Sequence, residues 1–285
     1  MVVLVTGASG QLGQSIQFIA KKYPEIQFLF FSSGELDISN FERCQMVFAQ
    51  HKPSFCINAA AYTAVDKAES EPEKAHLINV IGAQNIAEAC KTNHCVLVHI
   101  STDFVFDGTK RTPYTENDTT NPLGVYGKTK LEGEQAIQKI LERYFIIRTS
   151  WVYSQFGSNF MKTMLRLATE RDSISVVSDQ IGTPTNAVDL AECLVTIIQT
   201  HNLHPTKSNF GIYNFSNEGQ CSWFDFAKKI FEMNNVTIDL KPIPTSGYPT
   251  PAKRPSYSVM DKSKIKTNFN SQILPWQERI LISKI

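Results

Sequence analysis

The chain opens with a short apolar run that breaks into a glycine-rich loop. Residues 1–7 read MVVLVTG, and residues 7–13, GASGQLG, have the spacing G-x-x-G-x-x-G. A sharp turn from a buried strand into a helix requires residues without a Cβ atom, and the amides of such a loop can approach a pyrophosphate. A glycine-rich turn without a ligand is the alternative. The position between an N-terminal strand and a helix favours dinucleotide binding.

The first two-thirds of the chain alternate between apolar runs and helical patterns. The spacing predicts strands over 1–7, 26–31, 54–61, 95–103 and 144–150, with helices over 12–22, 41–51, 72–91 and 126–143. Such alternation predicts an α/β fold with a doubly wound parallel sheet, the Rossmann architecture, and right-handed crossovers.

The alternation loosens after residue 151. We expect helices over 159–170, 188–200 and 222–234, strands over 174–177 and 211–215, and irregular structure in the proline-dense PIPTSGYPTPAKRP. This pattern indicates a smaller C-terminal substrate domain with one segment returning to the main sheet. The predicted NAD(P)-binding domain comprises residues 1–150 and about 184–217, and the substrate domain about 151–183 and 218–285.

Composition argues against several classes of function. The 285 residues are 42% hydrophobic and 19% charged, which suits a folded chain with a substantial core. The net charge of +1 and the lack of a basic run argue against nucleic acid or an anionic membrane as a partner. Six scattered cysteines without a CxxC pair indicate reduced thiols and no metal site. With no apolar stretch of membrane-spanning length and no signal peptide, we expect a cytoplasmic protein.

The segment GVYGKTKLEGEQ places Tyr126 four residues before Lys130 among good helix formers, so both should share one face. An ammonium about 4 Å from a phenol is worth ~4 kcal/mol at an effective permittivity of ~20. The pKa of the phenol would then fall from about 10 toward about 7, where a general acid is most useful. Lys130 can also hold the ribose hydroxyls of a cofactor. A solvated Tyr–Lys pair is the alternative.

The fourth predicted strand ends in HISTDFVFDGT, which groups Ser101, Thr102 and Asp103. Strand ends of a doubly wound sheet face the ligand crevice, where a hydroxyl can bond a substrate carbonyl. Capping of the strand end is the alternative, although three polar residues in succession make it less apt. A nearby carboxylate would raise the pKa of a phenol. We therefore expect Asp103 to bind substrate hydroxyls and to lie farther from Tyr126 than Lys130 does.

These motifs together resemble the extended short-chain dehydrogenases/reductases. Longer blocks, among them NAAAYTAVDKAESEP, NPLGVYGKTKLEGE and YPTPAKRPSYSVMD, resemble the dTDP-4-dehydrorhamnose reductase family over nearly the whole chain. The resemblance implies hydride delivery from NADPH or NADH to the C4 ketone of dTDP-4-dehydro-L-rhamnose. Tyr126 would protonate the new alkoxide, and the product would be dTDP-L-rhamnose.

The resemblance also implies roles for individual residues. The implied catalytic residues are Thr102, Tyr126 and Lys130. The implied cofactor-binding residues are Gly7, Gly10, Gln11, Leu12, Gly13, Asp37, Ile38, Ala59, Ala60, Ala61 and Thr63, together with Tyr126 and Lys130. The implied ligands of the nucleotide sugar are Thr102, Asp103 and Trp151, with Val65 and Arg254 as weaker candidates. Trp151 as a core aromatic and Arg254 as a solvated cation are the alternatives.

The sequence leaves the cofactor and the assembly open. The second strand ends in FFSSGELD, with serines where an acid often binds the ribose and with no arginine to seat a 2′-phosphate, so we expect weak discrimination or an NADP bias. Some members of the family dimerise through magnesium held by acidic side chains, one of them early in the first helix. Ser15 stands in that region. We therefore expect no metal, and a homodimer stays open.

Two other functions are compatible with these motifs. One is reduction of another nucleotide-linked 4-keto-6-deoxysugar, for which the hydride and proton steps would be unchanged. The other is a non-catalytic NADP-binding regulatory subunit, as in the beta subunit of methionine adenosyltransferase. The presence of Thr102, Tyr126 and Lys130 together favours catalysis.

Overall fold

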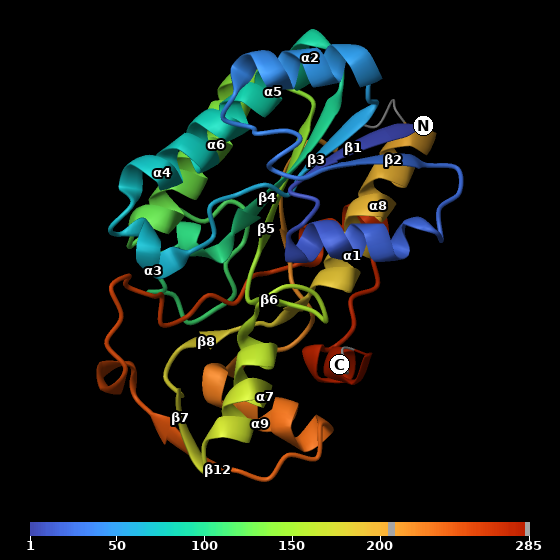
Figure 1. Cartoon of the computed structure of the whole chain (residues 1–285). Helices are drawn as coiled ribbons and strands as arrows, with labels where there is room; N and C mark the ends of the chain where they lie inside the picture. The colour runs from blue at the N-terminus through green and yellow to red at the C-terminus, as the bar shows by residue number, and fades with distance from the viewer. Residues whose placement is uncertain (205–208, 283–285) are drawn as a thin grey trace.

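Six parallel strands form the central sheet of the molecule (Figure 1). The computed structural model describes residues 1–204 and 209–282. The strands are β1 (Val2–Thr6), β2 (Gln27–Phe31), β3 (Phe55–Asn58), β4 (Val96–Thr102), β5 (Tyr144–Thr149) and β10 (Gly211–Phe215). Their order is β10-β5-β4-β3-β1-β2. From β1, the chain adds β2 on one side and β3, β4, β5 and β10 on the other, which confirms the predicted doubly wound Rossmann sheet. Residues 205–208 and 283–285, which the expected domain ranges include, lie outside the described residues.

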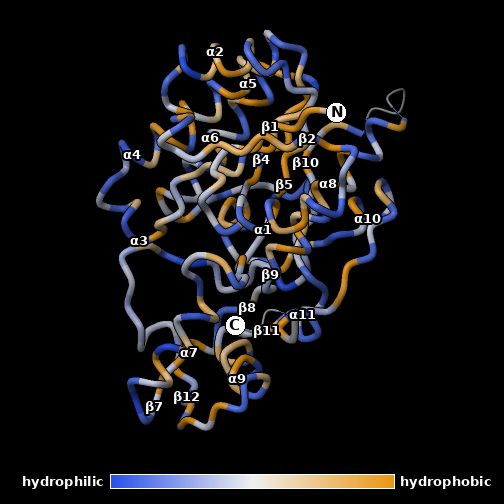
Figure 2. The backbone as a smooth tube through the Cα atoms, turned by 45° about the vertical axis from the view of Figure 1, so that its right-hand side comes forward, coloured by the Kyte–Doolittle hydropathy of each residue, from blue (hydrophilic) through white to orange (hydrophobic). Residues whose placement is uncertain are grey.

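Helices cover both faces of the sheet (Figure 1). One face carries α1 (Gln11–Ala20), α8 (Ala187–Leu203) and α10 (Ser263–Phe269), and the other carries α2 (Phe41–His51), α5 (Gly82–Thr92) and α6 (Val125–Ile140). Along β1, Val3 and Val5 enter the first layer and Leu4 enters the second, the alternation expected of a strand. Because both faces are covered, the strands are mostly apolar and form the hydrophobic centre in Figure 2, although a few buried polar residues lie among them. In residues 1–204 and 209–282, no helix has the length and apolarity needed to cross a bilayer.

The helix predicted over 72–91 is continuous but changes its pitch. After α4 (Pro72–His76) comes a π-helical turn, Leu77–Ile81, which leads into α5. In this turn the Asn79 side chain donates to the Tyr62 carbonyl at 3.2 Å and to the Thr129 hydroxyl at 3.1 Å. Such turns are frequent at functional sites. This one fastens α6 to the loop after β3.

A second, smaller lobe follows the fifth strand. In it, α7 (Phe160–Glu170) and α9 (Trp223–Met233) pack beside a parallel pair, β7 (Ser173–Val177) and β12 (Asp239–Ile243). These elements lie below the main sheet in Figure 1. They enclose apolar clusters of their own, one around Phe226 and one around Met164.

Short elements link the lobes. They are the pairs β6 (Val152–Tyr153) with β9 (Thr185–Asn186) and β8 (Ile181–Gly182) with β11 (Cys221–Ser222), helices α3 (Val65–Ala68) and α11 (Trp276–Ile282), and 3₁₀ turns at Asp103–Val105 and Thr245–Gly247. The sequence did not predict these elements, α10 or β12, whose last two residues fall in the proline-dense segment expected to be irregular. Two-residue strands and short helices carry little periodic pattern and depend on the packing around them.

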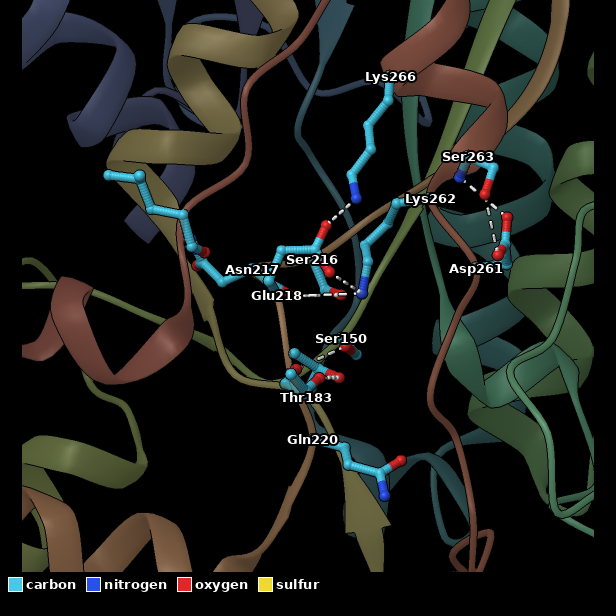
Figure 3. A network of polar contacts seen from close by, with 12 residues as sticks. Ser150, Thr183, Ser216, Asn217, Glu218, Gln220, Asp261, Lys262, Ser263 and Lys266 are labelled. Atoms are coloured by element: carbon cyan, nitrogen blue, oxygen red, sulfur yellow. Dashed lines mark hydrogen bonds and ion pairs between the residues drawn. The ribbon is translucent and has the colours of Figure 1, made fainter.

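A buried polar network joins the ends of β5 and β10 to the last part of the chain (Figure 3). The Ser150 hydroxyl donates to the Thr183 carbonyl at 2.7 Å, and the Thr183 hydroxyl donates to the Gly219 carbonyl at 2.8 Å. The buried Lys262 ammonium lies 3.5 Å from the Glu218 carboxylate. The network holds the carboxyl ends of two strands together, at the edge where doubly wound sheets bind ligands.

Candidate active site

The glycine loop between β1 and α1 is shaped by its backbone. Gly7 has a φ of +66°, and a Cβ atom on it would lie 2.7 Å from the Ala60 nitrogen. A Cβ atom on Gly13 would lie 2.4 Å from the Gly7 carbonyl oxygen. Gly10 is the N-cap residue of α1, and no side chain of the described residues caps this helix. The uncapped first amides of α1 and the lack of Cβ atoms fit a pyrophosphate.

Gln11 and Leu12 contribute differently from the glycines. The Gln11 Oε1 atom accepts hydrogen bonds from Ser154 Oγ and Asn159 Nδ2, both at 3.0 Å, and its Nε2 donates to the Val152 carbonyl at 3.3 Å. This side chain therefore ties α1 to the start of α7. Leu12 is buried in the core. Only the backbones of these two residues remain for a cofactor.

Asp37 and Ile38 lie in the loop before α2. Ile38 is buried against Gly82, where a Cβ atom would lie 2.6 Å from the Ile38 Cδ1 atom. The exposed Asp37 accepts hydrogen bonds from the Ser39 amide at 2.9 Å and the Ser39 hydroxyl at 2.7 Å. Ile38 can therefore offer a ligand its backbone only, whereas Asp37 keeps a solvent-facing carboxylate.

An arginine of α2, Arg43, reaches the end of β2, and the sequence pattern did not reveal this contact. Glu35 Oε2 accepts from the Ser32 amide at 2.8 Å and the Ser32 hydroxyl at 2.7 Å, which closes a turn after the strand. Arg43, exposed in the first turn of α2, donates from Nε to the Glu35 carbonyl at 3.1 Å. Helix α2 thus returns to the strand end and brings a cation there, which the eight-residue separation in sequence does not reveal.

The strand expected over 54–61 ends at Asn58, and Ala59–Ala61 continue as a loop. The Ala60 amide donates to the Thr6 hydroxyl at 3.3 Å, and the Tyr62 amide donates to Asn79 Oδ1 at 2.9 Å. These bonds hold the loop across the top of β1, directly against Gly7. Thr63 is exposed beyond this loop, and Val65 begins α3 half-buried.

Thr102 and Tyr126 meet at the carboxyl end of β4. The Thr102 hydroxyl donates to Asp103 Oδ1 at 3.1 Å and accepts from the Phe104 amide at 3.2 Å. The Tyr126 phenol lies beside this hydroxyl, which acts to lower the pKa of the phenol. Gly127 allows this approach, because a Cβ atom on it would lie 2.2 Å from the Phe104 carbonyl oxygen. The predicted hydroxyl and phenol are therefore neighbours.

Ser101 does not join them in the crevice. Its hydroxyl donates to Glu134 Oε1 at 2.5 Å, and Glu134 also forms a buried ion pair with Arg148 at 2.7 Å. Side chains alternate across a strand, so Ser101 and Thr102 point to opposite sides. The expectation that Ser101 crowds the crevice is wrong.

The predicted acidic phenol is not found. Desolvation raises the pKa of Tyr126 to about 12, the hydrogen bond from Thr102 opposes this, and the charge of Asp103 adds to it. Lys130 points inward instead, with its Nζ atom 2.7 Å from the Ile100 carbonyl oxygen and 3.3 Å from His99 Nε2. Burial lowers the pKa of Lys130 to about 8, against the charge of Glu134. In this arrangement the nearby charge that acts on the pKa of Tyr126 is that of Asp103 and not that of Lys130.

Asp103 is buried beside Thr102. Burial raises the pKa of its carboxyl to about 6, and hydrogen bonds from Ser258 and Thr102 oppose that rise. Ser258 lies in the segment that leads from β12 of the smaller lobe to α10 on the main sheet, so the two lobes meet at this carboxylate. A buried acid at a strand end is suited to accept hydrogen bonds from the hydroxyls of a ligand.

Glu69 is a positioning residue that the sequence analysis missed. Its Oε1 atom accepts from the Val125 amide at 2.8 Å, which caps the helix that carries Tyr126 and Lys130. Gly124 leaves room for this carboxylate, since a Cβ atom there would lie 2.6 Å from it. The cap and the helix are 56 residues apart in sequence, so no local pattern signals the contact.

Trp151 and Arg254 hold the lobes together. Trp151, at a φ of 47°, stacks on Trp223 with ring centroids 3.6 Å apart and an interplanar angle of 11°. Arg254 forms a two-pronged ion pair with Asp66 of α3, at 3.0 and 2.8 Å. One indole face and the guanidinium fork are therefore engaged within the protein, and a role for either residue in binding substrate stays a prediction.

The doubly wound sheet with a glycine loop after its first strand defines a Rossmann dinucleotide-binding fold, the fold of the extended short-chain dehydrogenases/reductases. The model of one family, described as RmlD substrate binding domain, matches residues 1–282. The dTDP-4-dehydrorhamnose reductase of Aggregatibacter actinomycetemcomitans is 42% identical over 98% of this chain and 96% of its own length. The chain belongs to the RmlD family, and the resemblance to dTDP-4-dehydrorhamnose reductases is confirmed.

Solved structures agree with this assignment. A dTDP-4-dehydrorhamnose reductase from Clostridium acetobutylicum superposes with a TM-score of 0.94 at 40% identity, covering 99% of this chain and 98% of that one. A dTDP-4-dehydrorhamnose reductase from Bacillus anthracis, crystallised with NADP, superposes with a TM-score of 0.93 at 40% identity and the same coverage.

Proposed function

We propose that this protein reduces the C4 ketone of dTDP-4-dehydro-L-rhamnose with NADPH or NADH and releases dTDP-L-rhamnose. The observation that carries the proposal is the placement of the Tyr126 phenol beside the Thr102 hydroxyl at the carboxyl end of β4, on a sheet whose first loop fits a dinucleotide. The names of relatives that match nearly the whole chain support the choice of substrate.

The glycine loop and the start of α1 would hold the pyrophosphate of NAD(P)H, and Ala59–Ala61 would line its path. When bound, this cofactor supplies the hydride. At the end of β2, Arg43 favours a 2′-phosphate and Glu35 opposes it, so we expect a modest preference for NADPH. The NADP bound to the Bacillus anthracis relative supports this preference.

Tyr126 would protonate the alkoxide that forms at C4. With a pKa of about 12, the phenol keeps its proton throughout the neutral range, and an alkoxide is basic enough to take it. To stabilise the resulting phenolate, the Thr102 hydroxyl would turn its hydrogen from Asp103 Oδ1 toward the phenolate oxygen. The Lys130 ammonium, one helical turn from Tyr126, would favour the same charge. Asp103 would accept hydrogen bonds from the sugar.

The direct test is oxidation of NADPH and of NADH by the purified protein with freshly made dTDP-4-dehydro-L-rhamnose. We expect turnover with both cofactors, faster at low concentration with NADPH. A panel of other nucleotide-linked 4-keto-6-deoxysugars tests the alternative substrate. Absence of turnover, together with a stoichiometric partner enzyme in a pull-down, would establish the regulatory subunit instead.

The division of labour between the lobes belongs to the same proposal. We assign residues 1–150 and about 184–217 to the cofactor and about 151–183 and 218–285 to the nucleotide sugar. Within the last range, α10 differs from this division, because it packs on the main sheet. The return of β10 to the main sheet and the separate clusters around α7 and α9 support this assignment. The cytoplasmic location, the lack of a metal and the homodimer stay predictions.

A further inference from the structure

Beneath the proposed active site, four buried polar side chains from four elements form a chain of contacts. Lys130 Nζ of α6 lies 3.3 Å from His99 Nε2 of β4, and His99 Nδ1 lies 3.1 Å from Asn58 Nδ2 of β3. Asn58 Oδ1 accepts from the Thr6 hydroxyl of β1 at 2.6 Å. All four residues are at most 2% exposed, so their hydrogen bonds have to be made within the protein.

The direction of these bonds follows from the asparagine. The Thr6 hydroxyl accepts from the Ala60 amide, which leaves its own hydrogen for Asn58 Oδ1. Asn58 therefore turns its amide nitrogen, a donor, toward His99, and Nδ1 has to accept. Burial and the charge of Lys130 hold the pKa of His99 well below its ordinary value, so the ring is neutral. Its single N–H hydrogen is then on Nε2.

That hydrogen faces the amino group of Lys130. A neutral amine can accept from His99 Nε2 while it donates to the Ile100 carbonyl, 2.7 Å away. An ammonium has donors only and would set two hydrogens against each other. The contact geometry therefore favours loss of the Lys130 proton.

The neighbouring elements place other ionisable groups around Lys130. Glu134, one turn further along α6, favours the ammonium, but Arg148 of β5 already pairs with that carboxylate. Tyr126 lies one turn back on α6, and Asp103 follows β4. With burial included, the pKa of Lys130 is lowered to about 8.

We propose that Asn58 and His99 form a positioning pair that favours the neutral amine of Lys130 and thereby sets the upper pH limit of the reduction. The inference rests on the proposed function, in which the Lys130 ammonium stabilises the Tyr126 phenolate. As the pH rises and Lys130 loses its proton, the phenolate loses this neighbour and the rate falls.

Asn58→Asp reverses the direction of the bonds. A carboxylate accepts from both Thr6 and the Nδ1–H of His99, which makes Nε2 an acceptor for the Lys130 ammonium. We expect the alkaline limb of kcat for NADPH oxidation to move up by at least about 1 pH unit. Asn93→Asp, which adds the same charge at the end of α5, should leave the limb in place. An unmoved limb in Asn58→Asp overturns the proposal.

The ring tautomer gives a readout that needs no turnover. Imidazole ¹H–¹⁵N NMR of the full chain, with His99→Gln to assign the signals, should show the Nε2–H tautomer in the wild type and the Nδ1–H tautomer in Asn58→Asp. An Nδ1–H tautomer or an imidazolium in the wild type at pH 7 overturns the proposal, also when Asn58→Asp fails to fold.

Lys130→Met separates this inference from the proposed function. A Lys130→Met variant with the wild-type rate and pH profile refutes the proposed function of Lys130 and the pH limit with it. A slow Lys130→Met variant combined with the wrong His99 tautomer in the wild type refutes the positioning pair alone.

Discussion

The cofactor loop and the buried catalytic residues below it lie at the same edge of the sheet but are built in different ways. These buried residues, Asp103, Tyr126, Lys130 and His99, are called the floor of the site. The loop, residues 7–13, is a backbone structure, in which Gly7 adopts a left-handed φ and Gly13 leaves no room for a Cβ atom. The floor consists of buried side chains, among them Lys130 and His99, whose partners come from several elements. A backbone requirement appears in one stretch of sequence as glycine, whereas a side-chain network is dispersed along the chain.

The two regions also carry charge differently. The loop offers amides at a helix end, which need no ionisable side chain. In the floor, burial raises the pKa of Tyr126 to about 12 and that of Asp103 to about 6, and it lowers the pKa of Lys130 to about 8. Such shifts gather at functional sites and reduce the stability of the fold.

Gly13→Val should have the largest effect, because it breaks the backbone region. The added Cβ atom would lie 2.4 Å from the Gly7 carbonyl oxygen and 2.6 Å from the Ala8 Cα atom, so the loop has to move. We expect NADPH affinity, measured by fluorescence titration, to fall at least ~10²-fold. Gly34→Ala is the control, since its nearest neighbouring atom would be 4.0 Å from the added carbon. Wild-type affinity in Gly13→Val would show that the loop does not hold the cofactor.

Asp103→Asn tests the floor through its charge. The folded-state pKa of this carboxyl is raised to about 6, so below about pH 4 both states are protonated, and as the pH rises toward 6 and beyond the fold loses stability. The asparagine should therefore stabilise the protein by on the order of 2–3 kcal/mol at pH 7.5 and hardly at pH 4, measured by urea unfolding. The exposed Asp172→Asn should change neither value. An equal effect of Asp103→Asn at both pH values would contradict the burial of a charge.

The features that the sequence predicts follow the same contrast between local backbone structure and dispersed side-chain contacts. The strands of the main sheet, the long helices and the glycine loop were predicted because each is specified within a short stretch by periodicity or by glycine. Tyr126 and Thr102 were predicted because the strand end and the helix start are both legible.

The direction of the Lys130 side chain was not predicted. It depends on His99 and the Ile100 carbonyl, both about thirty residues earlier in the chain. The partners of Trp151 and Arg254, which are Trp223 and Asp66, are likewise remote and carry no motif. The local sequence pattern predicts the position of a side chain on its helix or strand, whereas tertiary packing decides which groups that side chain contacts.

Glu69→Ala should have the smallest effect and sharpens the comparison. Loss of the cap on α6 should lower the free energy of unfolding by about 1 kcal/mol. Because this helix carries Tyr126 and Lys130, kcat should fall roughly 2–10-fold as well. Asn40→Ala removes the cap of α2 and should cost similar stability without a change in kcat. An unchanged kcat in Glu69→Ala would show that the floor tolerates movement of α6.

The central claim is that the Tyr126 phenol, which lies beside the Thr102 hydroxyl, gives its proton to the reduced sugar. The most direct measurement is the rate of NADPH oxidation with dTDP-4-dehydro-L-rhamnose for the wild type and for Tyr126→Phe, alongside the Kd for NADPH. The predicted result is a loss of at least ~10²-fold in kcat with an unchanged Kd. A Tyr126→Phe variant that turns over at a rate comparable to the wild type would contradict the account.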